Sequence, residues 1–397
     1  MTDADRTVLL VLEGTFPRHG GGGAESQVAT LARCLAARGV RVVVIVPRVP
    51  GGPQALRERI ENYEVVRIPY PRVRLLGGLV LLARLFWRLV AWHRRYAVIH
   101  AHIAHNMAAA SAFAGRLLRK RVFVKITGVH EMHGGILDPH PGFTARLRRA
   151  ALLHATGMQA TSTRIGKLLV ERGFARSQVA LVPNGVDTAR FARRPCDAQL
   201  KSELCADAAR VGIFVGRLSM EKGHPLLLEA WAAALAGSPG TRLLLVGEGP
   251  LRDGLQQAAQ RLGIGAQVVF AGHRDDVERL LAIADFAILS SHGEGLSNAL
   301  LEYMAAELPV VGSRVSGTED FIEHGSNGWL FEPGDGAGLA RALREVALTP
   351  EDELRRMGRQ ARERVQSVAS SEAVTGRLLA LYGFDAPQPP PRLVRAA

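Results

Sequence analysis

Residues 285–313 read DFAILSSHGEGLSNALLEYMAAELPVVGS, and this stretch decides the fold. A short apolar run, a loop with two glycines, a helical pattern and a second apolar run follow one another in it. This order is typical of a parallel sheet with helices on both faces. We therefore expect Glu294, in the loop, and Glu302, in the helix, near the carboxyl edge of the sheet, where such sheets bind ligands.

The same alternation continues in both directions along the chain. Apolar runs begin near residues 7, 40, 97, 121, 157 and 179, and a second series begins near 211, 241, 266, 285 and 308. Two such series predict an α/β chain of two Rossmann-like, doubly wound domains. We expect domains over 1–185 and 186–375. Residues 376–397 would hold the end of one helix over roughly 351–381 and a disordered, proline-rich tail.

Composition places the chain among ordinary globular proteins. Of its 397 residues, 47% are hydrophobic, which is enough to build sizeable cores. Three scattered cysteines exclude a disulfide framework or a cysteine metal cluster and are typical of a reducing compartment. The sequence opens without the pattern of a signal peptide, so a cytoplasmic location is expected.

The positive charge is concentrated in the first half of the chain. Residues 1–183 carry 27 Lys and Arg against 10 Asp and Glu, and residues 184–397 carry 23 against 27. This asymmetry favours an anionic partner, either a phosphorylated substrate or an anionic membrane, although an arginine-rich proteome gives the same bias. Dispersed arginines without an aromatic platform argue against nucleic acid, and no stable protein partner is predicted.

A strongly apolar segment, residues 75–95, contains Arg84 and Arg88 and is therefore a poor transmembrane candidate. Helical spacing places Arg84, Arg88 and Arg95 on one face, with leucine and tryptophan around them. Two interpretations stay open. The segment is either an amphipathic helix in peripheral contact with an anionic membrane, at the inner face of the plasma membrane, or a domain helix packed on the sheet.

The first crossover, EGTFPRHGGGGAESQ at 13–27, contains four consecutive glycines before a helix. Glycines such as Gly22 and Gly23 let the backbone approach a phosphate or a sugar closely. A flexible surface loop is the alternative. A dinucleotide fingerprint does not fit, because six residues separate Gly14 from Gly21 and the second strand ends in VPR instead of an acid.

Two cations follow the first strand of the second series. In VGRLSMEKG, residues 215–223, Gly216 and Arg217 end the strand and Lys222 precedes the next helix. Such a pair can clamp a diphosphate and neutralise the charge that develops on it, although a solvated basic turn is the alternative. A metal ion is not expected. The D-x-D pattern occurs at residues 3–5, near the terminus, and the spacing of His100 and His102 lacks further ligands.

The opening stretch offers a second anion-binding feature. Residues 295–298, GLSN, open a helix whose first amides can receive phosphate oxygens. Glu302 lies less than two turns into that helix and can accept hydrogen bonds from hydroxyls. A buried acid that is satisfied by backbone amides is the alternative for Glu302.

These motifs together resemble a known family. GRLSMEKG, VGEGP, FAGH, the Glu294–Glu302 pair and PVVGSRVSGTEDFIEHGSNGWLFEPGD, together with VPNGVD and GGGGAES, are similar to the retaining GT-B glycosyltransferases of the family 4 group, the glycosyl transferases group 1. The resemblance covers about residues 7–380. It implies a GT-B fold, in which an acceptor-binding domain and a nucleotide-sugar-binding domain face each other across a cleft.

The resemblance also assigns roles at the matching positions. It implies that Glu294 binds the donor sugar, Glu302 binds the ribose, and Arg217 and Lys222 hold the diphosphate. The further implied contacts are the amides of Gly295, Leu296, Ser297 and Asn298 to the phosphates, His273 or Arg274 beside the nucleobase, His130 near the sugar, and Gly22 and Gly23 at the border of the cleft.

The expected function is retaining transfer of a sugar from a nucleotide diphosphate sugar to an acceptor alcohol, without a metal or another cofactor. The basic first half favours a lipid-linked or anionic saccharide acceptor, in cell-surface polysaccharide or glycolipid synthesis. UDP and GDP donors are both open. The alternatives are a GT-B-like epimerase or phosphorylase, or a non-catalytic nucleotide-binding protein.

Overall fold

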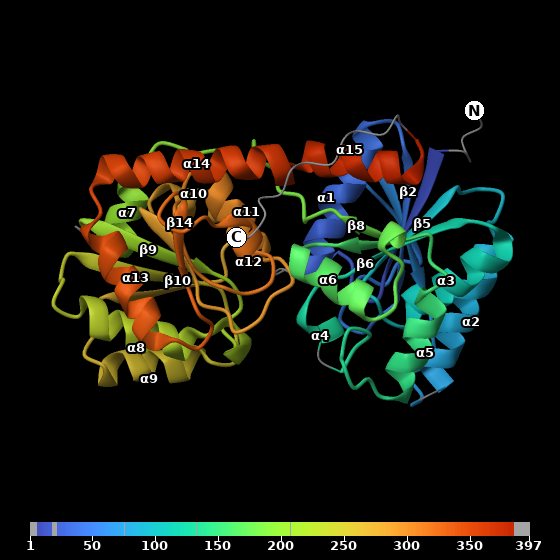
Figure 1. Ribbon diagram of the computed structural model, residues 1–397, viewed down its shortest axis with the longest axis horizontal. Coiled ribbons are helices and arrows are strands. Elements are labelled where there is room, and N and C mark those ends of the chain that lie inside the picture. The colour runs from blue at the N-terminus through green and yellow to red at the C-terminus, as the bar shows by residue number, and fades with distance from the viewer. Residues whose placement is uncertain (1–5, 18–21, 75, 133, 207, 385–397) are drawn as a thin grey trace. The chain divides into compact units, whose positions relative to one another are not determined.

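The computed structural model describes residues 6–17, 22–74, 76–132, 134–206 and 208–384, except for the side chains of Val129 and His130. Within these residues the chain forms two compact units. The first contains described residues of Met1–Gly185 and Ser371–Pro391, and the second contains those of Val186–Ser370. Each unit is a sheet with helices on both faces (Figure 1), so the predicted α/β class with two doubly wound sheets is confirmed.

The sheet of the first unit has eight strands in the order β3-β4-β2-β1-β5-β6-β7-β8. Every neighbouring pair is parallel except β3 and β4, which are antiparallel. The strands are β1 (Thr7–Leu12), β2 (Arg41–Pro47), β3 (Arg57–Ile60), β4 (Tyr63–Ile68), β5 (Val98–His102), β6 (Arg121–Lys125), β7 (Gly157–Ala160) and β8 (Val179–Leu181).

Helices cover both faces of this sheet. One face packs on α1 and α15 through a core that includes Leu35 and Leu378, and the other packs on α2 and α3 through a core that includes Leu85 and Ala112. The helices of this unit are α1 (Gly23–Ala37), α2 (Leu76–Ala91), α3 (Asn106–Leu118), α4 (Val129–Met132), α5 (Phe143–Leu152), α6 (Thr163–Glu171), η2 (Arg176–Gln178) and α15 (Ser371–Tyr382).

The sheet of the second unit is entirely parallel, with six strands in the order β11-β10-β9-β12-β13-β14. The strands are β9 (Arg210–Val215), β10 (Thr241–Val246), β11 (Val268–Gly272), β12 (Phe286–Leu289), β13 (Val310–Ser313) and β14 (Gly328–Phe331). The helices are α7 (Ala198–Cys205), η3 (Met220–Lys222), α8 (His224–Leu235), α9 (Arg252–Arg261), α10 (Val277–Ala282), α11 (Asn298–Ala305), α12 (Thr318–Phe321), α13 (Gly336–Leu348) and α14 (Glu351–Ala369).

The elements differ from the prediction in three places. The β3–β4 hairpin and strand β14 were not predicted, and the single helix expected over 351–381 is two helices, α14 and α15. Ser370, with ψ 145°, is extended and separates them. As a result residues 371–384 join the first unit, whereas the predicted second domain ran to residue 375. Most of the predicted tail, 385–397, lies outside the described residues.

Residues 76–91 of the apolar segment form helix α2, which packs on the sheet of the first unit through Leu81, Leu85 and Leu89. Its opposite side exposes Leu79 and Trp87. Among the described helices, none combines the length and the apolar character that a membrane span needs.

Candidate functional site

The topology of the second sheet brings the predicted site residues together. Strand order reverses between the neighbouring strands β9 and β12, which makes their carboxyl ends the switch point where such sheets bind ligands. The loop after β9 carries Arg217 and Lys222, and the loop after β12 carries Glu294. Two segments separated by some 70 residues therefore share one edge.

An ion pair joins these two loops. Lys222 Nζ donates to Glu294 Oε1, and the Ser291 hydroxyl donates to the same oxygen at 2.8 Å. Both charged side chains are largely buried, with exposed fractions of 22% and 13%. A partly desolvated pair is less screened than a surface pair, so this geometry holds the cation and the carboxylate firmly beside each other.

Backbone contacts also lock the two loops together. Ser290 Oγ donates to the Lys222 carbonyl at 2.9 Å, and the His292 amide donates to the Glu221 carbonyl at 2.9 Å. Gly223 lies between them with φ 69°, and a Cβ atom on it would stand 2.0 Å from the Ser290 carbonyl oxygen. The sequence needs glycine at this position for both its backbone conformation and its close approach.

Of the two predicted cations, Arg217 is more exposed than Lys222. Its guanidinium group donates to Glu221 at 2.7 Å, and its side chain is 65% exposed. Its loop is held from the other side by the VGEGP segment, because the Leu218 amide donates to the Glu248 carbonyl at 2.9 Å. A Cβ atom on Gly249 would stand 2.3 Å from the Leu218 carbonyl oxygen. Gly216, at the start of this loop, donates its amide to the Val246 carbonyl at 2.9 Å.

Helix α11 starts at the same edge. Asn298 is its first residue, and the hydroxyl of the N-cap residue Ser297 makes no capping hydrogen bond. The preceding turn, with Gly295 and Leu296, is held by Gly317, where a Cβ atom would stand 2.6 Å from the Gly295 carbonyl oxygen. The start of an α-helix carries partial positive charge, which suits a phosphate oxygen.

Glu302, on α11, is half-buried, and burial raises the pKa of its carboxyl group to about 7. The neighbouring Arg190 lowers this pKa and Glu278 raises it, but both effects are smaller. Among the described residues no backbone amide donates to its carboxylate, so the alternative of an acid satisfied by the backbone has no support in the hydrogen bonds of this part of the chain. The group is suited to accept hydrogen bonds from hydroxyls.

His273 and Arg274 follow β11 at the same edge of the sheet. His273 Nε2 lies 3.3 Å from Asp275 Oδ1. Arg274 makes two hydrogen bonds to Asp276, both of 2.7 Å, and these bonds hold the pKa of that carboxyl group below its usual range. The Arg274 side chain is therefore already engaged by its neighbour.

In the first unit, Gly22 is the N-cap residue of α1 and Gly23 is its first residue. A Cβ atom on Gly22 would stand 2.0 Å from the Glu25 carboxylate, so an acid already lies against the start of this helix. A carboxylate repels phosphate and accepts hydrogen bonds from sugar hydroxyls. His130 belongs to α4, and its side chain lies outside the described part of the chain.

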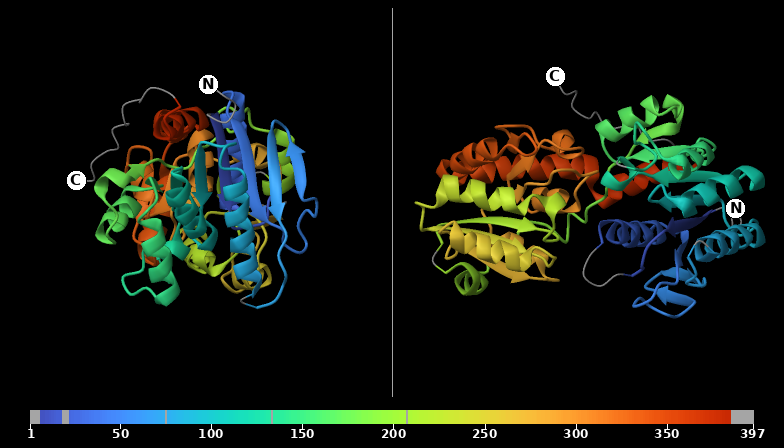
Figure 2. Two further views of the ribbon diagram at one scale, coloured as in Figure 1. Left: turned by 90° about the vertical axis from the view of Figure 1, so that its right-hand side faces the viewer. Right: turned by 90° about the horizontal axis from the view of Figure 1, so that it is seen from below.

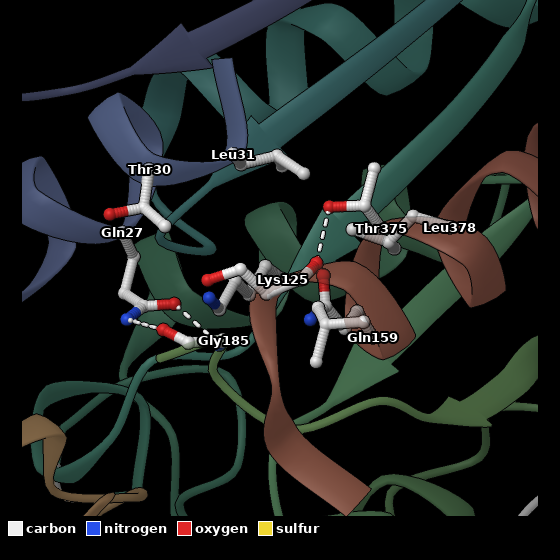
Figure 3. A pocket seen from close by; sticks show the side chains of 10 residues that line it. Gln27, Thr30, Leu31, Lys125, Gln159, Gly185, Thr375 and Leu378 are labelled. Atoms are coloured by element: carbon white, nitrogen blue, oxygen red, sulfur yellow. Dashed lines mark hydrogen bonds between the residues drawn. The ribbon is translucent and has the colours of Figure 1, made fainter. Parts of the chain in front are cut away.

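The first unit also contains a small cavity of about 20 Å³ with polar and apolar side chains in its lining (Figure 3). Lys125, Gln159, Gln27 and Thr375 line it, and Lys125 is only 4% exposed. Burial lowers the pKa of the Lys125 ammonium group to about 7. The volume is enough for a water molecule.

Two histidines lie near this lysine on the same sheet. His100 Nδ1 is 2.5 Å from the Tyr382 hydroxyl, and burial lowers the pKa of His100 to about 3 and that of His102 well below its ordinary value. Among the described residues no group of three or more His, Cys, Asp or Glu could hold a metal ion. The two histidines pack at a strand end.

Sequence reasoning missed the residues that position the site. Tyr303 is fully buried, and its hydroxyl accepts a hydrogen bond from the Val215 amide at 2.5 Å, which ties α11 to the end of β9. Ser291 supports Glu294, and Glu221 supports Arg217. The four-residue spacing of Arg217 and Glu221 was no signal for the second of these pairs, because that spacing brings side chains together on a helix and Arg217 lies in a loop. The contact of Tyr303 had no sequence signal either, because it joins residues 88 apart.

Comparison with known proteins agrees with this geometry. Residues 21–190 match the profile of Glycosyltransferase Family 4, and residues 209–348 match that of Glycosyl transferases group 1. The chain is 30% identical to the 2-deoxystreptamine glucosyltransferase of Streptomyces kanamyceticus over 349 residues, 82% of this chain and 89% of that protein. It is 27% identical to the N-acetyl-alpha-D-glucosaminyl L-malate synthase of Bacillus anthracis over 369 residues, 92% and 94% of the two chains.

Solved structures share the fold. The Anabaena protein HepE, solved in complex with UDP, has a TM-score of 0.77 and 22% identity, and the match covers 95% of this chain and 99% of that one. WaaG, a glycosyltransferase involved in lipopolysaccharide biosynthesis, has a TM-score of 0.72 and 19% identity, with 95% and 100% covered. The two mainly parallel sheets, the switch-point residues and these matches establish that the chain belongs to the family 4, group 1 glycosyltransferases of GT-B type and is a glycosyltransferase.

Proposed function

We propose that the protein transfers a sugar from a nucleotide diphosphate sugar to an acceptor alcohol with retention at the anomeric carbon. The observation that carries the proposal is the Lys222–Glu294 ion pair at the β9/β12 switch point. This pair places a cation that suits phosphate directly beside a carboxylate that suits sugar hydroxyls. In a nucleotide sugar, the diphosphate and the sugar hydroxyls likewise lie next to each other.

In this proposal the ligand lies along the edge of the second sheet. Glu294 binds the sugar, Lys222 and Arg217 bind the diphosphate, and the amides of residues 295–298 bind phosphate oxygens. Glu302 accepts from the ribose, and His273 or Arg274 lies beside the base. His130, Gly22 and Gly23 are proposed to contact the donor from the first unit.

The proposed chemistry needs no carboxylate nucleophile. The acceptor oxygen bonds to the anomeric carbon while the bond from that carbon to the diphosphate oxygen breaks, on the same face of the sugar. The acceptor proton passes to the departing phosphate, and the nucleoside diphosphate leaves. Arg217 and Lys222 stabilise the charge that develops on that phosphate, so we propose that no metal is required.

We further propose that the acceptor is a lipid-linked or anionic saccharide, used in cell-surface polysaccharide or glycolipid synthesis at the inner face of the plasma membrane. The support is the excess of basic residues in 1–183, where the acceptor-binding domain lies in this family. Association with an anionic acceptor is favoured by such a field.

The test is release of nucleoside diphosphate from a panel of UDP and GDP sugars, with and without EDTA. We expect release with at least one donor, unchanged by EDTA, and a loss of at least a hundredfold in Lys222→Met and Glu294→Gln. Glu353→Gln, which removes an exposed ion pair with Arg356, is the matched control and should retain full activity. NMR of the product should show the donor's anomeric configuration.

No release from any donor, or full activity in Glu294→Gln, would refute the proposal. A requirement for inorganic phosphate in place of an acceptor alcohol would instead identify a phosphorylase.

A further inference from the structure

An exposed apolar face lies on three neighbouring helices of the first unit. It consists of Leu79 and Trp87 on α2, Phe113 and Leu117 on α3, and Phe143 and Leu147 on α5, each between 56% and 76% exposed. We call these six residues the apolar face. A large exposed apolar patch on a globular protein marks an interaction surface.

The helices are held together as one platform. Helix α3 contacts α2 on one side and α5 on the other, and the rings of Phe86 and Phe113 lie 6.1 Å apart across the α2–α3 contact. Figures 1 and 2 show the three helices side by side on one face of the sheet. The platform is therefore part of the folded unit, so its residues keep fixed relative positions.

These exposed residues do not belong to the sides of the helices that pack on the core. On α2 the core side is made by Leu81, Leu85 and Leu89, and helical spacing sets Leu79 and Trp87 on the other side. On α3 and α5 the exposed residues are four apart, Phe113 with Leu117 and Phe143 with Leu147, so each pair forms a stripe along its helix. The buried residues of each helix, such as Ala112 and Ala145, lie elsewhere on its surface.

The charged residues on the three helices of the apolar face are all arginines. The three helices contain Arg84, Arg88, Arg116, Arg146, Arg148 and Arg149, and no Asp or Glu. Arg84 and Arg146 donate to backbone carbonyls, of Pro69 and Pro141, and Arg116 contacts His154, so none of these three cations is neutralised by a described carboxylate. An apolar surface bordered by arginines complements an anionic lipid bilayer.

We propose that the apolar face docks on an anionic membrane, with its leucines and aromatic rings at the headgroup boundary and Arg84, Arg116 and Arg146 on lipid phosphates. Trp87 suits this depth, because its ring combines an apolar body with a polar N–H group. The proposal deepens the proposed function by naming the surface that holds the protein at its lipid-linked acceptor. It rests on the exposed face and not on the transfer chemistry.

The experiment is sedimentation of the full-length protein with phosphatidylcholine vesicles and with vesicles that contain phosphatidylglycerol, at low and high salt. We expect at least tenfold stronger binding to the anionic vesicles, weakened by salt. The double variant Trp87→Gln/Phe113→Gln should lose at least tenfold in binding, and Arg84→Gln/Arg146→Gln should lose the preference for anionic lipid. Leu348→Gln, which changes a leucine that is 83% exposed on α13, is the matched control and should bind as the wild type.

Three outcomes would overturn the proposal. The first is a wild type that stays in the supernatant, and the second is a Trp87→Gln/Phe113→Gln variant that binds as well as the wild type. The third is a wild-type dimer in light scattering that the same variant converts to a monomer, because the apolar face would then bind a second copy. Release of nucleoside diphosphate, measured on the same samples, separates this result from a failure of the proposed function.

Discussion

At the scale of the single residue, Lys125 is a buried ammonium group in a cavity with no carboxylate in its lining. Burial lowers the pKa of its ammonium group from 10.5 to about 7. Between pH 7 and pH 10.5 the unfolded chain therefore binds a proton at this residue that the folded chain does not bind. The free energy of unfolding should therefore rise with pH across this range, by roughly 1.4 kcal/mol per pH unit. Lys125→Met removes the cost of burial.

We expect Lys125→Met to be more stable than the wild type in urea unfolding. Its advantage should be largest at pH 7 and should shrink as the pH approaches 10. Lys201→Met, on α7 in the second unit, serves as the control and should show no such trend. An advantage of Lys125→Met that does not change with pH would contradict the assignment of the lowered pKa.

Glu302 gives a second prediction at this scale. Its pKa is raised to about 7, and ribose hydroxyls that donate to the carboxylate would favour the charged form and lower that pKa in the complex. Binding of an intact nucleotide sugar should then weaken below pH 7, by up to about tenfold per pH unit. Calorimetric titrations at pH 6 and pH 8 measure this, and Glu302→Gln should abolish the difference. A wild-type affinity that is independent of pH would remove Glu302 from the ribose site.

Three charged residues of the site were predictable because each lies between an apolar strand and the next long helix, whose places the strand pattern fixes. Arg217 and Lys222 follow β9 and Glu294 follows β12, and parallel strands bring their carboxyl ends to one edge. The buried state of Lys125 was not predictable, since VFVKITG also fits a lysine at an exposed strand end.

At the scale of the elements, the site depends on how closely two loops approach. Gly223→Ala would force a Cβ atom against the Ser290 carbonyl oxygen, and its φ of 69° is unfavourable for alanine. Gly263 has φ 71° with no neighbouring atom within 4 Å, so Gly263→Ala carries the backbone cost alone, about 1–2 kcal/mol. We expect Gly223→Ala to be less stable than Gly263→Ala and to lose at least tenfold in donor turnover, as thermal melts and nucleotide release would show. Equal effects of the two changes would mean that the loops separate freely.

Tyr303 ties α11 to β9 and provides a further test. In Tyr303→Phe the Val215 amide loses its side-chain partner, at a cost of about 1–3 kcal/mol for a buried donor. Urea unfolding should show this loss. Tyr63→Phe, at a tyrosine that is only 4% exposed, is the comparison, and we expect it to cost less because no described residue bonds to its hydroxyl. Equal stability of Tyr303→Phe and the wild type would contradict the role of Tyr303 as a tie.

Most strands with long apolar runs could be predicted, but the short apolar strand β14, GWLF, and the polar strand β3 could not. The hairpin β3–β4 turns at Glu61, which has φ 50°, and its first strand reads RERI, which is too polar to be recognised as a strand. The break at Ser370 lies in VASSEA, where neither glycine nor proline ends the helical pattern. The extended backbone of Ser370, together with the pairing of Val186 with Ser370, determines that break.

At the scale of the whole molecule, the chain passes between the two units at Gly185–Val186 and again at Ser370–Ser371. In the first unit the Gln27 side chain holds the first of these points, bonding to both the amide and the carbonyl of Gly185 at 3.0 and 2.9 Å. The second unit contains the switch point with the ion pair, and the first contains the excess of basic residues and the apolar face. Our proposals therefore place donor binding and attachment to a surface in separate units.

The central claim is that the switch point of the second unit binds the nucleoside diphosphate of a sugar donor. Isothermal titration of UDP and of GDP onto the protein tests it most directly. We predict one site per chain for one of the two nucleotides, weakened at least tenfold in Lys222→Met and unchanged in Lys201→Met. Absence of binding by both nucleotides, or equal affinity in Lys222→Met and the wild type, would contradict the claim.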